Sequence, residues 1–300
     1  MDTHASTPWP ALPLASWQDT YATLHMYTQV VGKLRLALCP RENQFWQVAL
    51  YLTARGLGTS PMPYDGKTID IEFDFIDHQL VLRVSDGTRR TMPLRALPVR
   101  DFYRDLMAML GEVGCPVHIW PHPVEVPNPI DFEDDTRHAT YDADAAHRFW
   151  EILRRIDVVF KKFRGRFMGK SSPVHFFWGS FDLAVTRFSG RPAPPRPDAD
   201  PITRESYNQE VISLGFWPGG SGVDGAAFYS YTAPAPAGLE AQPIQPERAF
   251  WHPQLKEFLL MYDDVRAAAD PEELILQFAQ STYEAGARLA GWDRKALELG

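Results

Sequence analysis

Residues 169–191 read GKSSPVHFFWGSFDLAVTRFSGR, and the sequence is organised around this stretch. A long amphipathic helix is expected before it, and proline-rich loops follow it. Its apolar and aromatic residues predict two strands, 174–178 and 181–188, with a bend at Gly179-Ser180 between them. Because side chains alternate along a strand, Phe176 and Trp178 should share one face and His175 the other.

Asp182 interrupts an apolar run, 181–185, at a place where an ionised carboxylate is costly unless it is paired. We expect Asp182 to be buried and paired with a cationic or hydrogen-bond-donating group, with His175, Arg187 or Lys170 as the candidates. Two interpretations stay open. His175, Asp182 and Arg187 are candidate catalytic residues, or they form a structural pair, because buried ion pairs also shift pKa values without catalysing a reaction.

A glycine-rich stretch, 215–222, follows a predicted strand and carries Trp217. Such a loop can move over a site, with the tryptophan as an apolar contact. The candidate ligand-binding residues are His25, Trp178, Trp217 and Tyr229, which would line a pocket for a small molecule. The alternative is that these aromatic side chains belong to the hydrophobic core.

The rest of the second half follows helix and strand periodicities. Asp142 caps a predicted helix that Gly165 can end, with apolar residues at helical spacing between them. Asp270-Pro271 is a strong start for a last helix, which ends before Gly291. Further strands are expected at 211–216, 228–232 and 258–262.

The first half repeats this plan. A helix is expected from Ser16 to about Gly32, strands at 45–54 and within 68–95, and another helix at 99–113.

A two-residue turn at Asp77-His78 predicts the register of the first hairpin. It pairs Phe73 with Leu82 on one face and places Glu72 opposite Arg83 on the other. A turn this short cannot carry a parallel crossover, which needs a dozen residues or more. The sheets are therefore expected to be mostly antiparallel.

Together these elements predict an α+β fold of two similar lobes, each a mostly antiparallel sheet flanked by helices. The parallel layout of the halves is also what an internal duplication would produce. The predicted division is an N-terminal lobe at 1–120, a proline-rich acidic linker at 121–141 and a C-terminal lobe at 142–300.

Composition argues against several classes of function. The 300 residues carry a net charge of −8 with scattered basic residues, which argues against a nucleic-acid partner. The two cysteines form no pairing pattern, and the sequence shows neither a signal peptide nor an apolar run of membrane-spanning length. We expect a cytoplasmic protein without a membrane partner.

Three motifs fall short of known sites. Residues 165–171 have three residues between their glycines where a phosphate loop has four, and they follow a helix instead of a strand. No Gly-x-Ser-x-Gly elbow of a serine hydrolase occurs. Cys115, His118 and His122 have metal-like spacings but no evident fourth ligand. The sequence therefore predicts no metal and no cofactor.

Several segments share a pattern: 23–29 (TLHMYTQ), 55–57 (RGL), the central stretch 172–191, 215–219 (GFWPG) and 281–284 (STYE). With them the chain resembles, over nearly its whole length, a bacterial family of uncharacterised proteins, a domain of unknown function. The resemblance implies a bacterial cytoplasmic protein and carries no activity over. Similar proteins often have histidine near Gln44 and near Asn208 or Gln209, and its absence here weakens any metal site at those positions.

Two classes of function are therefore weighed. The first is a protein that binds a small molecule in an aromatic-lined pocket, with or without catalysis. The second is a non-catalytic interaction or scaffold protein, in which the His/Asp/Arg cluster is structural. A deep pocket with converging polar groups favours the first, and a filled core with a broad exposed apolar patch favours the second.

Overall fold

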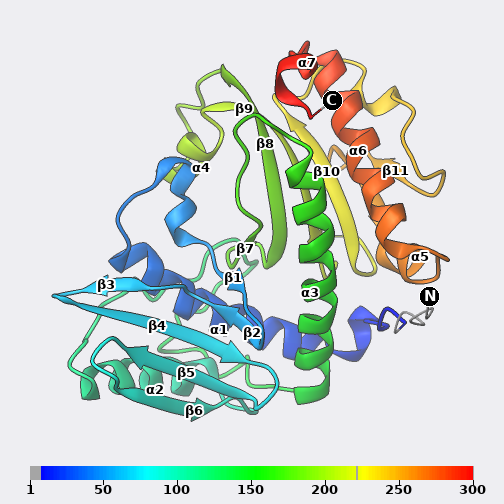
Figure 1. The fold of residues 1–300 in the computed structure, drawn as a ribbon. Helices are drawn as coiled ribbons and strands as arrows, with labels where there is room; N and C mark the ends of the chain where they lie inside the picture. The colour runs from blue at the N-terminus through cyan, green and yellow to red at the C-terminus, as the bar shows by residue number, and fades with distance from the viewer. Residues whose placement is uncertain (1–7, 221, 300) are drawn as a thin grey trace, which may run out of the picture.

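The computed structural model describes residues 8–220 and 222–299. Two six-stranded sheets organise this part of the chain (Figure 1). Within the described ranges every pairing between named strands is antiparallel. The predicted α+β fold with antiparallel sheets is confirmed.

The first sheet has the order β1-β2-β4-β5-β6, with β3 paired to β4. Its strands are β1 (Tyr51–Leu52), β2 (Gly56–Gly58), β3 (Met62–Tyr64), β4 (Lys67–Asp74), β5 (Gln79–Val84) and β6 (Arg89–Pro93). The second sheet has the order β11-β12-β10-β9-β8-β7. Its strands are β7 (His175–Phe177), β8 (Asp182–Pro192), β9 (Gln209–Trp217), β10 (Ala227–Ala233), β11 (Phe250–His252) and β12 (Glu257–Met261).

The main helices are α1 (Gln18–Leu38), α2 (Val99–Glu112), α3 (Ala143–Gly165) and α6 (Pro271–Leu289). Short helical segments are η1 (Leu14–Ser16), η2 (Asn43–Val48), α4 (Pro201–Ser206), η3 (Leu239–Ala241), α5 (Tyr262–Arg266) and α7 (Arg294–Leu297). As predicted, Asp142 caps α3 and Asp270 caps α6, each by accepting a backbone N–H of the first turn.

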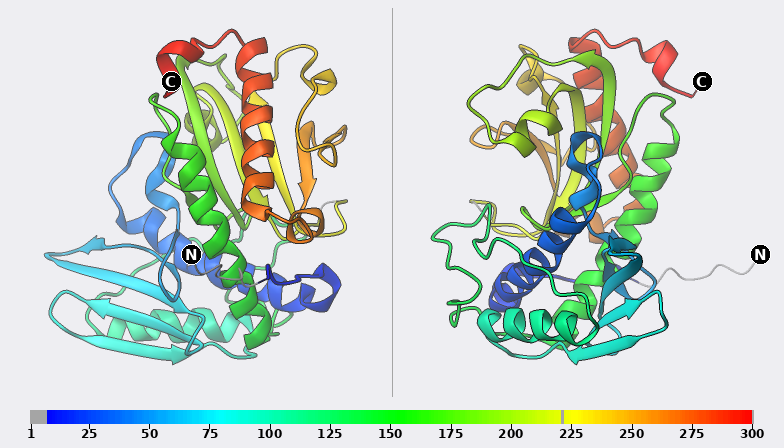
Figure 2. Two further views of the ribbon diagram at one scale, coloured as in Figure 1. Left: turned by 45° about the vertical axis from the view of Figure 1, so that its right-hand side comes forward. Right: turned by 90° about the vertical axis from the view of Figure 1, so that its left-hand side faces the viewer.

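Helices α3 and α6 pack side by side on one face of the second sheet (Figures 1 and 2). Among the described residues no long helix packs across the opposite face of that sheet. That face is approached instead by η2, which belongs to the first half of the chain, and by α4, which lies between β8 and β9 (Figure 2). This face, opposite α3 and α6, is where the candidate site lies.

Helix α1 runs between the two sheets and contacts both halves (Figure 2). Tyr27 stacks on Phe102 of α2, with 3.9 Å between ring centroids, and Gly32 lies against the indole of Trp178. The predicted end of this helix near Gly32 is wrong, because the helix continues to Leu38. Gly32 does not stop the helix; it leaves room for the Trp178 ring, which a Cβ at position 32 would overlap.

The first hairpin has a register two residues away from the predicted one. Phe73 pairs with Leu80, and Arg83 lies directly opposite Asp70 instead of Glu72. The cause is a longer turn, 75–78, which the Asp74 carboxylate stabilises by accepting two backbone N–H groups at 2.9 and 3.0 Å. A shift of two residues keeps every side chain on its predicted face, so Phe73 is still fully buried.

The strand expected at 45–54 is mostly wrong. Residues 43–48 form η2, with left-handed backbone at Gln44 and Phe45, and only Tyr51–Leu52 pairs as β1. Two backbone carbonyls of this segment bind side chains instead of a neighbouring strand. The carbonyl of Gln47 accepts from Arg35 at 2.7 Å, and that of Val48 accepts from Trp178 at 2.7 Å.

The predicted linker, 121–141, contains no helix or strand, yet Phe132 and Asp135 within it are fully buried. The division into lobes at 1–120 and 142–300, like the internal duplication, stays a prediction. In the part of the chain that the structure describes, no helix combines the length and the apolar character needed to cross a bilayer.

Candidate functional site

A cavity of about 660 Å³ lies on the face of the second sheet opposite α3 and α6. Its floor comes from β8, β9 and β10, and its walls come from η2, from residues 124–125 and from the α4 region. Alternation along β8 decides which side chains reach it, since even-numbered residues face the cavity and odd-numbered ones face α3 and α6. The β8 residues that line it are Asp182, Ala184, Thr186 and Phe188.

One end of the cavity is acidic. Asp182 is only 4% exposed, and its carboxyl group accepts hydrogen bonds from the Ser180 hydroxyl at 2.6 Å and from the Tyr229 hydroxyl. No lysine, arginine or histidine among the described residues pairs with it. Burial therefore raises the pKa of Asp182 above its ordinary value, and the two hydroxyl groups only partly oppose this.

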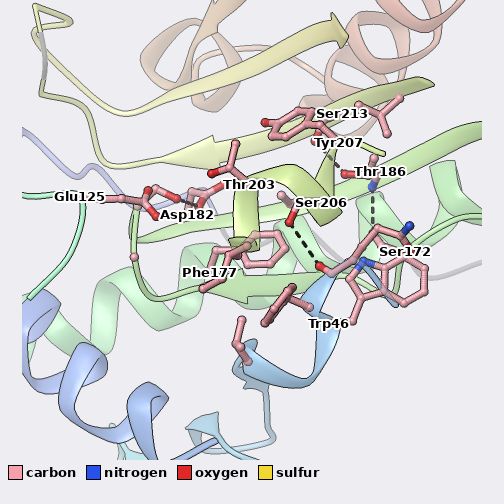
Figure 3. A pocket seen from close by; sticks show the side chains of 18 of the residues that line it. Trp46, Glu125, Ser172, Phe177, Asp182, Thr186, Thr203, Ser206, Tyr207 and Ser213 are labelled. Atoms are coloured by element: carbon pink, nitrogen blue, oxygen red, sulfur yellow. Dashed lines mark hydrogen bonds between the residues drawn. The ribbon is translucent and has the colours of Figure 1, made fainter. Parts of the chain in front are cut away.

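The charge of Asp182 contributes to the raised pKa values of two further carboxyl groups. Glu125 lies at the rim beside Gly179, and desolvation, followed by the charge of Asp182, raises its pKa (Figure 3). Glu257 opens β12, and burial, again followed by Asp182, raises its pKa to about 7. Asp182 and Glu125 therefore form an acidic end of the pocket in surroundings that favour their neutral forms, and Glu257 lies outside the lining.

The other end of the cavity presents hydroxyl groups, and Figure 3 shows them across from Glu125 and Asp182. The hydroxyls of Thr186 and Ser213 lie 3.0 Å apart across β8 and β9. Those of Tyr207 and Tyr231 lie 2.8 Å apart. The walls are also aromatic, with Trp46, Phe177 and Trp178 among the lining side chains.

Tyr229 is held in place from several sides. Its ring covers Gly215, where a Cβ would overlap the phenol, and it stacks on Tyr231 at 6.1 Å. Trp217 packs edge-on against it at 5.7 Å. A glycine at position 215 is therefore a requirement for placing the Tyr229 hydroxyl on Asp182.

The structure brings three of the sequence-predicted site residues together at this cavity, namely Trp178, Asp182 and Tyr229. The expected burial of Asp182 is confirmed. The expected pairing with a hydrogen-bond donor is found, but the donors are the hydroxyls of Ser180 and Tyr229, and the named candidates His175, Arg187 and Lys170 were wrong.

Arg187 does not line the cavity. As an odd-numbered residue of β8 it points to the helices, where it is 1% exposed and donates to the backbone carbonyl of Phe163. Its guanidinium carbon lies 3.5 Å from the ring centroid of Phe163 and 4.3 Å from that of Tyr283. The predicted grouping with His175 and Asp182 needs correcting, because alternation along the strand separates Arg187 from Asp182.

His175 also does not line the cavity. It pairs with Ala184 in the sheet and is fully buried beneath Trp46 and Phe177, with ring centroids 5.9 and 5.2 Å away. Neither ring nitrogen has a hydrogen-bond partner among the described residues, and burial lowers its pKa to about 3. His175 is therefore a neutral side chain in an aromatic cage, two residues along β7 from the one opposite Asp182.

His25 and Trp217 flank the site without lining it. His25 of α1 lies beneath the Gly179 turn, with its Nε2 2.8 Å from the carbonyl oxygen, and burial lowers its pKa to about 4. Trp217 belongs to β9 and packs behind Tyr229. Within the predicted mobile stretch 215–222, Gly215 and Trp217 are strand residues, and Ser221 lies outside the described residues.

Sequence reasoning missed several residues of the pocket. Thr186 shares the Asp182 face of its strand, so the period of two could have identified it. Glu125 came from the predicted linker, and Tyr207 from the α4 region, where no periodic signal exists. No three or more His, Cys, Asp or Glu side chains in the described ranges form a group that could hold a metal ion.

Replacing Glu257 with glutamine should stabilise the protein at alkaline pH. The folded state holds a proton on Glu257 up to about pH 7, whereas the unfolded chain releases it near the ordinary pKa of 4.5. The free energy of unfolding therefore falls as pH rises between these values, and Glu257→Gln removes this loss. We expect a gain of about 3 kcal/mol at pH 8 and almost none at pH 4.

Urea unfolding of both proteins at pH 4, 6 and 8 measures this difference. Glu240→Gln, at an exposed glutamate of η3, controls for the loss of one negative charge. A Glu257→Gln effect that is constant with pH would contradict the assigned protonation.

The sequence was also compared with known protein families, curated proteins and solved structures. A family profile described as "Family of unknown function (DUF5996)" matches residues 9–299. No curated protein and no solved structure matches the chain.

Proposed function

Because the chain belongs to the DUF5996 family, whose function is unknown, we propose a function from the pocket itself: the protein binds a small organic molecule between the second sheet, η2 and α4. The observation that carries this proposal is the cavity of about 660 Å³. Ligand pockets typically have about 300–1,000 Å³, mostly apolar walls and a few placed polar groups. This cavity combines aromatic walls with an acidic end and a hydroxyl end.

The open cavity also favours a small-molecule-binding protein over a scaffold protein. A structural cluster would be closed by its own contacts, but the carboxyl of Asp182 and the hydroxyls of Thr186 and Ser213 border open volume. We also propose a cytoplasmic location in bacteria. The free thiols of Cys39 and Cys115 fit a reducing compartment, and the family resemblance points to bacteria.

A variant that fills the cavity tests the proposal. Thr186→Phe replaces a floor residue with a larger one that strands accept well, so the sheet should be preserved. We expect compounds from a metabolite library to bind the natural protein and to lose affinity by about tenfold or more in this variant, which corresponds to about 1.4 kcal/mol. Native mass spectrometry and thermal shift would measure both.

Thr91→Phe is the matched control, since it makes the same substitution at an exposed strand position of β6. It should bind as the natural protein does. Equal binding by Thr186→Phe, or no binder for the natural protein, would overturn the proposed function.

A second candidate function, acid–base catalysis on the bound molecule, is favoured by one observation. Glu125 and Asp182 face the same end of the cavity, and both have raised pKa values. A carboxyl group that keeps its proton nearer to neutral pH is suited to donate it. Mass analysis of each binder after incubation would detect turnover, and turnover unaffected by Asp182→Asn would exclude this role.

A further inference from the structure

The two ends of the pocket differ in charge: Asp182 and Glu125 lie at one end, whereas the Lys170 ammonium donates to Gln44 at 2.6 Å beside Phe188 at the other. Burial, and after it the charge of Asp182, raise the pKa values of two carboxyl groups, Glu125 and Glu257, and of three neutral phenols, Tyr21, Tyr207 and Tyr229. Among the lining residues with a permanent charge, Asp200 caps α4, and Arg196 stacks on Tyr207 at 4.2 Å from the exposed side. No cation within the described residues reaches Asp182.

A buried carboxylate without a cation is unusual, because burial of an unpaired charge is costly and proteins normally pair such a group or keep it neutral. Asp182 has two hydroxyl donors, from Ser180 and Tyr229, but no positive charge among the described residues, and its carboxyl group borders the cavity. The free volume next to it is the one place from which a counter-ion can come.

The walls suit the same kind of ligand. Trp46, Phe177 and Trp178 are among the side chains that line the cavity. Aromatic faces attract cations through their quadrupole, and they also bury apolar carbon chains and rings. The hydroxyls of Thr186 and Ser213 then remain for a polar group at the far end of the ligand (Figure 3).

We propose that the pocket selects organic cations: an ammonium or amidinium group pairs with Asp182 beside Glu125, and the apolar body of the ligand lies along the aromatic walls. This inference rests on the proposed function and names the class of ligand. When such a cation binds to the protonated form of Asp182, the carboxyl group loses its proton to water and the ion pair forms. Affinity for the cation therefore rises with pH while Asp182 and Glu125 are being ionised, and then levels off.

Matched sets of compounds test the inference. Each set keeps one apolar body and carries a primary amine, an alcohol or a carboxylate on the same chain, as in tryptamine, tryptophol and indole-3-acetate, with phenyl, naphthyl and alkyl bodies alongside. Isothermal titration should show the amine of a binding set to be preferred by about tenfold or more over its alcohol. Titration at pH 5 and 8 should show the amine, but not the alcohol, binding more tightly at the higher pH.

Two variants distinguish recognition of the ligand's positive charge from binding of its apolar body in the pocket. Asp182→Asn should lower amine affinity by about tenfold or more and change alcohol affinity by less than about threefold, so that alcohol binding reports an intact pocket. Glu125→Gln, at the rim, should lower amine affinity less. Asp134→Asn, at an exposed aspartate outside the pocket lining, should change neither.

The outcomes distinguish the two proposals. If alcohols or carboxylates bind as well as amines, and lose affinity in Thr186→Phe, the pocket binds ligands but the inference about charge is overturned. Amine affinity that survives Asp182→Asn overturns it as well. If no compound of any set binds, or if Thr186→Phe binds like the natural protein, the proposed function itself fails.

Discussion

Gly32→Ala is expected to destabilise the protein by about 3 kcal/mol. At a helix position where the added Cβ meets no other atom, the same substitution stabilises the folded protein. Alanine is favoured over glycine within helices by about 1 kcal/mol. In α1, however, a Cβ at position 32 would overlap the indole of Trp178, which is 5% exposed and donates to the carbonyl of Val48. The ring cannot move aside without breaking that bond, and overpacking of this kind costs about 1–3 kcal/mol or more.

Gly111→Ala is the matched control, because Gly111 lies in α2 with no atom within 4 Å of an added Cβ. It should stabilise the protein by a few tenths of a kcal/mol to about 1 kcal/mol. Chemical unfolding measures the change in the free energy of unfolding for both variants, which should be negative for Gly32→Ala and positive for Gly111→Ala. Stabilisation by Gly32→Ala would mean that Trp178 is free to move.

Because Trp178 also lines the cavity, Gly32→Ala should weaken ligand binding too.

Arg187→Ala is expected to cost about 3–4 kcal/mol of stability. The side chain is 1% exposed and fills the space among the rings of Phe163, Phe167 and Tyr283. Truncation leaves a cavity in a core that can collapse only partly. Burial lowers the pKa of Arg187 to about 10, so the guanidinium group is still charged at neutral pH.

Arg187→Met distinguishes the volume of the side chain from its charge. Methionine fills much of the same space and needs no desolvation of a charge, so stability should stay within about 1 kcal/mol of the natural protein. Ligand binding should be unchanged, since Arg187 faces away from the cavity. Unfolding and titration of the two variants are the measurements. A methionine variant as unstable as the alanine variant would show that the charge itself is required.

The first hairpin shows how far sequence reasoning about the fold could go. Alternation correctly assigned Phe73 to the buried face and predicted antiparallel pairing, because these depend on a period of two. The exact register depends on the turn, and the turn depends on a side chain, the Asp74 carboxylate, that binds backbone two and three residues ahead. No apolar pattern reports such a bond, so the register was two residues off.

The candidate site likewise has residues that the sequence could identify and residues that it could not. Asp182 could be identified because a lone carboxyl within an apolar run is conspicuous. Its partners could not be identified, since Tyr229 reaches it from another strand and Glu125 from a segment without periodicity. Arg187 and His175 were placed with Asp182 because they are near in sequence. One of them points to the opposite face of the sheet, and the other is covered by Trp46.

The composition of the pocket walls has a consequence for folding order. The floor is made by β8 to β10, whereas Trp46 and Glu125 come from segments that precede it by more than fifty residues. Contacts between such distant segments close long loops, and their entropic cost delays them during folding. A molecule that spans floor and wall would act as a cross-link between the halves of the chain. It should slow amide hydrogen exchange in η2 and β8 together, although η2 belongs to the first half of the chain and β8 to the second.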